Sequence, residues 1–213
     1  MKNKLRRVSR RTASSSRWLY RHVNDPFVKK AKVEQYRSRA AYKLLEINKK
    51  FNLIREGSVV LDLGSAPGGW SQVIANTLNG TGRVIAVDLA DMESIPGVEV
   101  VKLDIELQRK ELYEYIGGVE LDVIVSDLAP SASGSRATDS ISSIRLAELV
   151  LQYAKSSLKK FGAVVIKILR GSEDEYRFVN LLKKEFKKVE YFKPDASRKA
   201  SREIYLILLS KLT

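Results

Sequence analysis

The sequence of 213 residues predicts one α/β domain with a doubly wound, mainly parallel sheet and a short basic appendage. From Val59 onward, short apolar runs alternate with helical patterns, as in parallel strands joined by helices. Hydrophobic residues make up 44% and charged residues 30% of the chain, an ordinary globular composition. No apolar run approaches the roughly 18 residues that a membrane span needs, so we expect no membrane association.

The elements follow from the periodicity of the apolar residues. The segment "SRAAYKLLEINKKF" predicts a helix that Ser38 caps. Seven strands are expected at Val59–Leu63, Arg83–Val87, Val98–Leu103, Leu121–Ser126, Ala163–Leu169, Lys187–Phe192 and Ile204–Leu209. Four helices are expected between them, at Trp70–Leu78, Leu107–Ile116, Ser142–Lys160 and Glu173–Phe186. The connection "PDASRKASR" is too short for a helical crossover, so the last two strands should be antiparallel.

The positive charge is concentrated at the N-terminus. The net charge is +13, and residues 1–37 contain twelve Lys or Arg but only two acids, Asp25 and Glu34. This pattern indicates a polyanionic partner, most naturally nucleic acid. A solvated tail that aids solubility is the alternative, and an anionic membrane fits less well because no amphipathic apolar face accompanies the charges. We therefore expect residues 1–34 to form a basic, partly flexible RNA-binding arm and residues 35–213 to form the main domain.

The chain contains no cysteine, which excludes disulfides, cysteine–zinc sites and thiolate nucleophiles. A reducing cytoplasm is compatible with this composition, and the N-terminus has no apolar segment typical of a secretory signal. Cytoplasmic localisation is therefore expected. The only histidine, His22, lacks the partners that a metal site requires, so we expect no metal.

The stretch "LDLGSAPGGW" lies at the end of the first predicted strand, where doubly wound sheets bind their ligands. Its glycines, Gly64, Gly68 and Gly69, have the spacing G-x-x-x-G-G and not the dinucleotide fingerprint G-x-G-x-x-G. The spacing disfavours an NAD-dependent oxidoreductase. It indicates a turn on which a ligand without phosphates lies close to the backbone.

Two acids at successive strand ends indicate which ligand this is. Asp88 follows Gly64 by 24 residues, near the position at which an acid accepts hydrogen bonds from ribose hydroxyls. Asp104 ends the third predicted strand, where it could reach an adenine edge. An acid-rich pocket also suits a cationic sulfonium. S-adenosylmethionine (SAM) meets these demands. The alternative is an α/β domain without this site, in which the glycines are ordinary turn residues and the aspartates are simply exposed.

The sequence limits which chemical groups could accept a methyl group. Methyl transfer needs a nucleophile held in line and freed of its proton. Methylation at carbon-5 of a pyrimidine usually uses a cysteine, which this chain lacks. Methylation of exocyclic amines usually uses an N-P-P-Y-type loop, whereas the loop here is "SDLAPSASG". A hydroxyl acceptor is therefore favoured.

Four charged residues are placed where the sheet could bring them together. Lys43 lies on the helix before the first strand, Asp127 ends the fourth strand, and Glu203 opens the last strand in "SREIYLILL". Lys167 lies within the apolar fifth strand "AVVIKILRG", where a lysine is costly to bury unless it is paired. These residues either orient and deprotonate a ribose hydroxyl or form ion pairs at the sheet edge.

Six blocks in a fixed order carry a resemblance to a known family. They are "SRAAYKL", "DLGSAPGGWSQV", "AVDL", "SDLAPSASG", "VVIKILRG" and "KPDASRKASREIY", spread between Gln35 and Leu209. With them the chain resembles the FtsJ/RrmJ family of ribose 2′-O-methyltransferases, particularly its branch acting on large-subunit ribosomal RNA. The resemblance implies a Rossmann-like, class I SAM-dependent methyltransferase with a seven-stranded, mostly parallel, doubly wound sheet whose last strand is antiparallel.

The resemblance also implies which residues carry the function. The family's catalytic tetrad falls on Lys43, Asp127, Lys167 and Glu203, with Lys167 central as the base or as the residue that orients the ribose hydroxyl. The family's cofactor contacts fall on Gly68, Trp70, Asp88, Asp104 and Asp127. With the other glycines of the turn, the expected cofactor-binding set is Gly64, Gly68, Gly69, Trp70, Asp88, Asp104 and Asp127.

The substrate that the resemblance implies is a uridine 2′-hydroxyl in the A-loop of 23S-type ribosomal RNA, within the large subunit, and the enzyme is expected to be a monomer. Two alternatives remain, a tRNA anticodon-loop ribose methyltransferase and a non-catalytic ribosome-assembly factor that binds RNA. Trp18 and Tyr20, within the basic stretch, could stack on bases or pack on the core. Tyr153, Tyr176 and Tyr191 need only a core or surface explanation.

Overall fold

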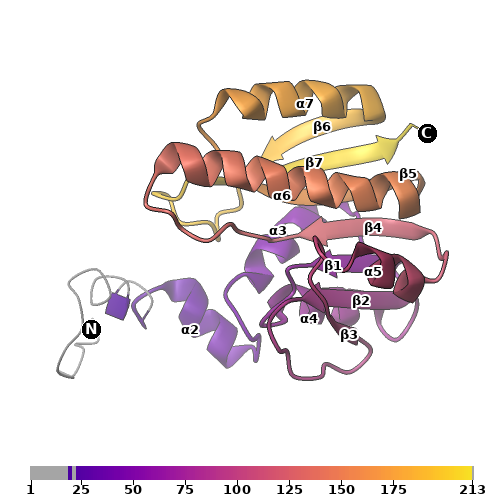
Figure 1. Cartoon of the computed structure of the whole chain (residues 1–213). Helices are drawn as coiled ribbons and strands as arrows, with labels where there is room; N and C mark the ends of the chain where they lie inside the picture. Colours follow the sequence, from indigo (N-terminus) through magenta and orange to yellow (C-terminus); the bar gives the residue numbers. More distant parts are fainter. Residues whose placement is uncertain (1–18, 21–22, 213) are drawn as a thin grey trace.

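The computed structural model describes residues 19–20 and 23–212, which form one seven-stranded sheet with helices on both faces (Figure 1). The strand order is β3-β2-β1-β4-β5-β7-β6. Strands β1 to β5 are parallel, and β7 is antiparallel to both of its neighbours. The predicted sheet is therefore confirmed. The strands are β1 Val59–Leu63, β2 Arg83–Asp88, β3 Glu99–Lys102, β4 Leu121–Ser126, β5 Leu158–Leu169, β6 Phe186–Phe192 and β7 Glu203–Lys211.

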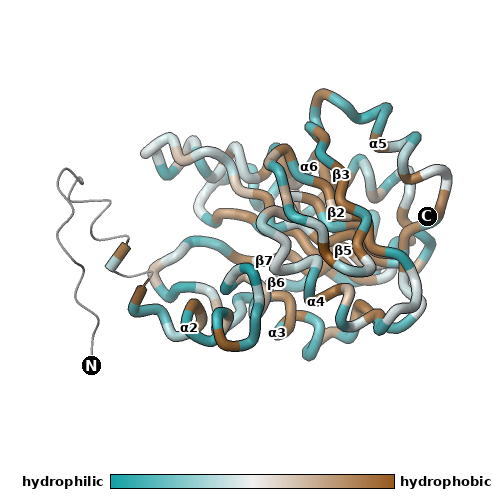
Figure 2. The backbone as a smooth tube through the Cα atoms, turned by 90° about the horizontal axis from the view of Figure 1, so that it is seen from below, coloured by the Kyte–Doolittle hydropathy of each residue, from teal (hydrophilic) through white to brown (hydrophobic). Residues whose placement is uncertain are grey.

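The helices form two layers, one on each face of the sheet. Helices α5, α6 and α7 bury their apolar sides against one face, and α3 and α4 against the other. Figure 2 shows hydrophobic residues concentrated along the central strands, between these layers. The helices are α2 Pro26–Val33, α3 Ala41–Phe51, α4 Gly69–Leu78, α5 Arg109–Ile116, α6 Arg136–Ser157 and α7 Glu173–Glu185. Within the described part of the chain, none of these is long and apolar enough to cross a membrane.

The alternation of side chains along β5 and β7 determines which face carries the charged residues. Val165 on β5 and Ile207 on β7 pack in the core beneath α3 and α4. Because successive residues of a strand point to opposite faces, Lys167 shares the face of Val165, and Glu203 and Tyr205 share that of Ile207. Helix α3, which contains Lys43, covers this same face.

Three predicted boundaries of the later helices are wrong by two residues or more. The helix expected at Ser142–Lys160 begins six residues earlier, at Arg136, because the Ser135 side chain caps it by accepting the Thr138 N–H. The helix expected to end at Lys160 ends at Ser157, because β5 already begins at Leu158, which pairs with Leu121 before a register shift in the ladder. The helix expected from Leu107 begins two residues later. There the Asp104 carboxylate accepts the backbone N–H groups of Glu106 and Leu107, which forms a separate turn.

The predicted cap of α3 is also wrong. The N-cap residue is Ala40, which makes no side-chain capping bond, and the helix begins at Ala41. Ser38 instead lies against the start of α4, where a Cβ added to Gly69 would come within 2.4 Å of the Ser38 hydroxyl oxygen. Gly69 therefore allows the N-termini of α3 and α4 to approach closely.

Helix α2 packs against the main domain, although its residues were expected to belong to the arm. Asp25 caps the helix through the Phe27 N–H at 3.0 Å and forms an ion pair with Arg39. Ala31 packs with Tyr42 in a small core at the start of α3. Residues 1–18 and 21–22, with Trp18, His22 and most of the arm's basic side chains, lie outside the described residues. The division at residue 34 stays a prediction, but contact with the main domain begins before it.

Candidate active site

The candidate site lies at the carboxyl edge of the sheet. Strand β1 is flanked by β2 on one side and β4 on the other, so the connections diverge between β1 and β4. Ligands of doubly wound folds bind at such a switch point. Gly64 follows β1 there, and Asp127 follows β4. Strand β7 runs antiparallel to β5, so it begins at this edge with Glu203.

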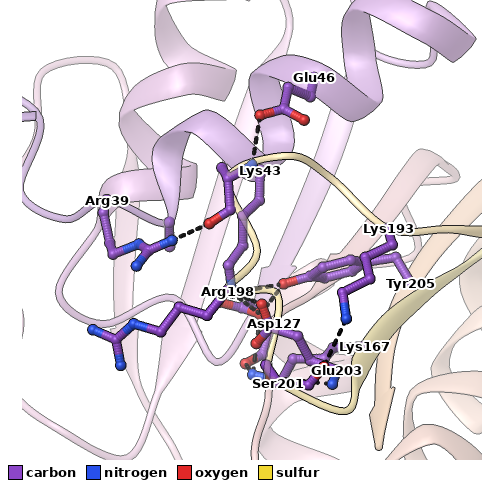
Figure 3. A network of polar contacts seen from close by, with 12 residues as sticks. Arg39, Lys43, Glu46, Asp127, Lys167, Lys193, Arg198, Ser201, Glu203 and Tyr205 are labelled. Atoms are coloured by element: carbon purple, nitrogen blue, oxygen red, sulfur yellow. Dashed lines mark hydrogen bonds and ion pairs between the residues drawn. The ribbon is translucent and has the colours of Figure 1, made fainter. Parts of the chain in front are cut away.

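The structure brings the four residues of the expected tetrad together (Figure 3). Lys167 Nζ lies 3.0 Å from Asp127 Oδ1 and also donates to the backbone carbonyl of Asp127. Lys43 Nζ lies 2.9 Å from Glu203 Oε1 and 3.9 Å from Asp127 Oδ1. The cluster is thus a chain of alternating charges, Lys167–Asp127–Lys43–Glu203.

Burial makes this pairing obligatory. Lys43 and Lys167 are 8% and 9% exposed, and unpaired ammonium groups at such depth are strongly disfavoured. Two carboxylates balance the two amines. An ammonium group has three donors, and two of those on Lys167 are directed at Asp127, so one remains for a substrate oxygen.

Asp127 stays ionised in this environment. Burial raises the pKa of its carboxyl, but the charges of Lys43 and Lys167 and the hydrogen bond from Tyr205 outweigh it, and the net pKa lies below its usual value. For Tyr205, burial first and the negative charge of Asp127 second raise the pKa well above the usual range. The phenol therefore remains a donor at all physiological pH values.

Tyr205 is a site residue that the sequence analysis missed. Its hydroxyl donates to Asp127 Oδ1 at 2.6 Å and accepts from Lys43 Nζ at 3.1 Å. A signal was present, because Tyr205 follows Glu203 by two residues in an otherwise apolar strand and so points to the same face.

Trp70, expected to contact the cofactor, buries its side chain in the core next to the tetrad. The indole is 3% exposed, donates through Nε1 to the carbonyl of Ala40 at 2.8 Å and packs against the Tyr205 ring at a centroid distance of 5.7 Å. The side chain thus supports the tetrad from the core, and the expected contact of Trp70 with the cofactor stays a prediction.

Asp88 holds the glycine turn in place. Its two carboxylate oxygens accept the N–H groups of Ala66 at 2.9 Å and Ala90 at 2.8 Å. Gly64 has a φ of +79°, and a Cβ there would meet Leu128 at 2.7 Å, so only glycine fits between β1 and the loop after β4. Each carboxylate oxygen of Asp88 has a second lone pair, which leaves it able to accept a hydroxyl as well.

Arg37 is a second residue that the sequence did not indicate. Its guanidinium donates to three backbone carbonyls, those of Pro67 at 3.3 Å, Glu93 at 2.7 Å and Ser94 at 2.8 Å. It therefore ties the glycine turn to the loop between β2 and β3. Gly68, with a φ of +107°, is packed beneath Ile95 of that loop. Nothing in the pattern distinguished Arg37 from the other basic residues around it.

Asp104 and Leu89 line the same edge farther along the sheet. Asp104 uses Oδ1 for its backbone bonds, at 2.8 and 3.0 Å, and among the described residues its other oxygen accepts no hydrogen bond. Leu89 follows Asp88 and is 66% exposed, an unusual amount for a leucine at a strand end. A free carboxylate oxygen beside an exposed apolar side chain is an arrangement suited to a nucleoside.

Asp62 is a buried acid within β1 that the sequence analysis did not mark. It is 1% exposed, and Ser71 donates to its Oδ2 at 2.6 Å. Burial raises the pKa of Asp62 to about 7, and the Ser71 hydrogen bond only partly opposes this. Its other oxygen is buried without a partner among the described residues. Asp62 therefore contributes to the fold beneath the glycine turn.

The described part of the chain contains no group of three or more acidic or histidine side chains that could hold a metal ion.

Comparisons with known proteins agree with this geometry. The model of the family described as FtsJ-like methyltransferase matches residues 36–211. The chain belongs to the FtsJ-like methyltransferase family. It is 87% identical to the ribosomal RNA large subunit methyltransferase E of Neorickettsia sennetsu over the full length of both chains. It is 48% identical to the protein of the same name from Marinobacter nauticus, over 92% of this chain and 96% of that one.

A solved structure of the same class shares the fold. A ribosomal RNA methyltransferase from Plasmodium falciparum superimposes with a TM-score of 0.75 and 29% identity, covering 83% of this chain and 99% of that one. Membership of the FtsJ-like family confirms the resemblance found in the sequence and makes this protein a methyltransferase.

Proposed function

We propose that this FtsJ-like methyltransferase transfers the methyl group of SAM to the 2′-hydroxyl of a uridine in large-subunit ribosomal RNA, in the cytoplasm. The observation that carries the proposal is the alternating cluster of Lys167, Asp127, Lys43 and Glu203 at the switch point of the sheet. The names of the two bacterial relatives support ribosomal RNA of the large subunit as substrate.

The residues at the edge of the sheet fit SAM. Asp88 and the free oxygen of Asp104 are acceptors for ribose and adenine donors, and Leu89 offers an apolar surface to a base. Among the described residues Asp88 and Asp104 form no ion pair, so their negative charge favours a cation, and Asp127 lies close to them at the switch point. A pyrophosphate, as in NAD, would be repelled by these carboxylates. When bound, SAM supplies a methyl group made electrophilic by its positively charged sulfur.

The tetrad positions the acceptor. Lys167 holds the ribose oxygen through the donor that Asp127 leaves free, and Lys43 fixes Asp127 and Glu203 in place. The hydroxyl becomes strongly acidic as its oxygen gains the methyl group, so its proton can leave to water late in the step. Orientation of the oxygen in line with the methyl group is then the main contribution of the protein.

The basic surface beside the tetrad supports an RNA substrate. Helix α2 exposes Lys29, Lys30 and Lys32, and the loop between β6 and β7 carries Arg198 and Lys199. This loop is anchored to α3 because Glu46 accepts the N–H groups of Asp195 and Ala196 at 2.5 and 2.9 Å. The loop and α2 lie against each other, because Ala196 packs with Ala31 and Arg198 pairs with Asp25. Together their positive side chains suit the phosphates of an RNA strand that approaches the tetrad.

The test is methyl transfer from labelled SAM to separate RNA substrates. Undermethylated large subunits, free large-subunit RNA and tRNA are incubated with the enzyme, and the label is mapped after nuclease digestion. We expect label in large-subunit RNA at one uridine. Label in tRNA alone would establish the anticodon-loop alternative, and label in no RNA would refute the proposed function.

A further inference from the structure

A pocket of about 640 Å³ lies next to Glu203, outside the tetrad. Its walls come from the loop after β5, the first turn of α7, the residue that follows β6 and the residues at the start of β7. The side chains that matter here are Arg170, Tyr176, Lys193 and Arg202. Its size lies within the range of roughly 300–1,000 Å³ typical of ligand sites.

The topology places this pocket beside the catalytic edge. Because β7 is antiparallel to β5, its first residue pairs with the last residue of β5, Glu203 with Leu169. The tetrad and the pocket therefore share Glu203, which faces Lys43 at 2.9 Å and also lines the pocket. Figure 3 shows Lys193 reaching toward Ser201 beside Glu203. A polymer bound in the tetrad would have its next unit within reach of the pocket.

Two acids of the pocket wall are already engaged. Glu175 is buried, lies 3.3 Å from Arg170 Nε and accepts the N–H of Gly171 at 3.2 Å. Glu203 is paired with Lys43. A third acid, Glu173, is exposed at the first turn of α7, where solvent screens its charge.

Two cations of the pocket are not neutralised. Arg202 Nη1 donates to the carbonyls of Arg136 and Arg170, each at 3.0 Å, and Lys193 Nζ donates to the carbonyl of Ser201 at 2.7 Å. Within the part of the chain that the structure describes, neither group forms an ion pair with a carboxylate. Both therefore remain available to an anion.

The pocket also presents an aromatic ring. Tyr176 is 65% exposed, although it lies in the first turns of α7 and lines the pocket. A ring beside two available cations matches a nucleotide, whose base can stack on the ring while its phosphate contacts the cations.

We propose that this pocket binds the nucleotide adjacent to the methylated one in the RNA strand, with its base on Tyr176 and its phosphate on Lys193 and Arg202. The inference rests on the proposed function, because that function supplies the RNA strand in the tetrad. By holding a neighbouring nucleotide, the pocket fixes the direction in which the target ribose enters and contributes to the choice of site.

The test uses the full-length enzyme with Tyr176→Ala and Lys193→Gln. Glutamine keeps a donor for the Ser201 carbonyl and removes only the charge. The matched controls are Leu181→Ala and Lys184→Gln, which change exposed residues at the far end of α7. RNA affinity is measured by filter binding with S-adenosylhomocysteine present, and kcat and KM are measured with the RNA that the wild type methylates.

For Tyr176→Ala we expect RNA affinity to fall and KM for RNA to rise about tenfold, the size of one lost stacking contact. The affinity for SAM and kcat at saturating RNA should stay unchanged. For Lys193→Gln the slope of log affinity against log salt should fall by about 0.7, the value for one phosphate contact in a single strand. Both controls should match the wild type.

The outcomes separate the pocket from the proposed function. If the wild type methylates RNA but Tyr176→Ala and Lys193→Gln behave as their controls do, the pocket proposal is overturned and the proposed function stands. If the wild type binds RNA through the pocket but methylates none, the proposed function fails and the pocket stands as an RNA site. If the wild type neither binds nor methylates RNA, both are refuted.

Discussion

The phenol of Tyr205 donates to the same Asp127 oxygen that pairs with Lys167, at 2.6 and 3.0 Å. The same phenol accepts a hydrogen bond from Lys43. Its ring packs on Trp70, which lies in the first turn of α4, the helix after the glycine turn. Tyr205 thus links the two lysines of the tetrad to the element that carries the expected cofactor site.

Tyr205→Phe should lower kcat about tenfold, because one lost hydrogen bond to a charged group is worth about 1.5 kcal/mol and the carboxylate of Asp127 would be less firmly placed. SAM affinity should be unchanged. The rate of methyl transfer at saturating substrates measures the effect. The control is Tyr113→Phe, which removes a hydroxyl near Gln152, away from the tetrad. An unchanged kcat in Tyr205→Phe would mean that the phenol is only a packing group.

Lys167 can be tested as donor or as base with two substitutions. Lys167→Ala should lower kcat at least about a hundredfold, while SAM affinity stays within a few-fold. Lys167→Arg keeps a positive donor but cannot give up a proton. If Lys167 orients the oxygen, Lys167→Arg should retain clearly more activity than Lys167→Ala, whereas equal loss in both variants would indicate a base. Equilibrium binding of SAM confirms that the cofactor site is intact.

Arg37→Ala should weaken SAM binding, because the guanidinium ties the glycine turn to the loop between β2 and β3. We expect a rise of about tenfold in the Kd for SAM, equivalent to about 1.4 kcal/mol, with little change in kcat at saturating SAM. Isothermal titration calorimetry measures the Kd. Arg55→Ala removes an exposed arginine elsewhere and serves as control. Loss of kcat without loss of SAM affinity would contradict this role.

Asp62 should make stability fall as pH rises. Burial raises its pKa to about 7 in the folded protein, against an unfolded value of about 3.9. Between these values the folded state holds the extra proton, so the free energy of unfolding decreases with pH by up to about 1.4 kcal/mol per unit from this group. Above pH 7 the contribution is constant.

Asp62→Asn removes that titration while keeping the size of the side chain and an acceptor for Ser71. The variant should therefore lose the decline between pH 4 and 7 that Asp62 causes in the wild type, and its stability relative to the wild type should be greatest at pH 8. Urea unfolding at several pH values measures the slopes. Parallel wild-type and variant curves would show that Asp62 does not titrate in this range.

Deletion of residues 1–18 should weaken RNA binding and flatten its salt dependence. The deletion removes seven Lys or Arg but leaves the pair of Asp25 and Arg39 that anchors α2. Each lost phosphate contact should reduce the slope of log affinity against log salt by about 0.7 to 0.9. Filter binding at several salt concentrations measures it. An unchanged slope would mean that the arm does not contact the RNA.

Much of the fold was predictable because it depends on local patterns. The seven strands could be predicted from continuous apolar runs. The antiparallel direction of β7 could be predicted from the short connection before it. The wrong boundaries have local causes that periodicity does not carry. The Asp104 turn delays α5, and the pairing of Leu158 with Leu121 starts β5 early. The capping prediction failed because Ser38 serves a contact with Gly69, a residue 31 positions away.

Site residues were predictable where a charged residue occurs within an apolar strand or at the end of a strand. Lys167 in an apolar strand and Asp127 at a strand end stood out, and the structure places them 3.0 Å apart. Tyr205 was missed because tyrosine in a strand is ordinary. Arg37 was missed because its role depends on carbonyl groups that fold back to it from a loop 56 residues later. Such contacts are set by the tertiary structure and leave no local pattern.

The most direct test of the central claim is the position of the methyl group on the RNA. Large subunits lacking the modification are incubated with the enzyme and SAM carrying a labelled methyl group, and the RNA is then hydrolysed in alkali. A ribose methylated at its 2′-oxygen resists cleavage at that nucleotide. We predict label in an alkali-resistant dinucleotide that contains uridine, formed by the wild type and not by Lys167→Ala. Label on a base, or equal labelling by Lys167→Ala, would contradict the account.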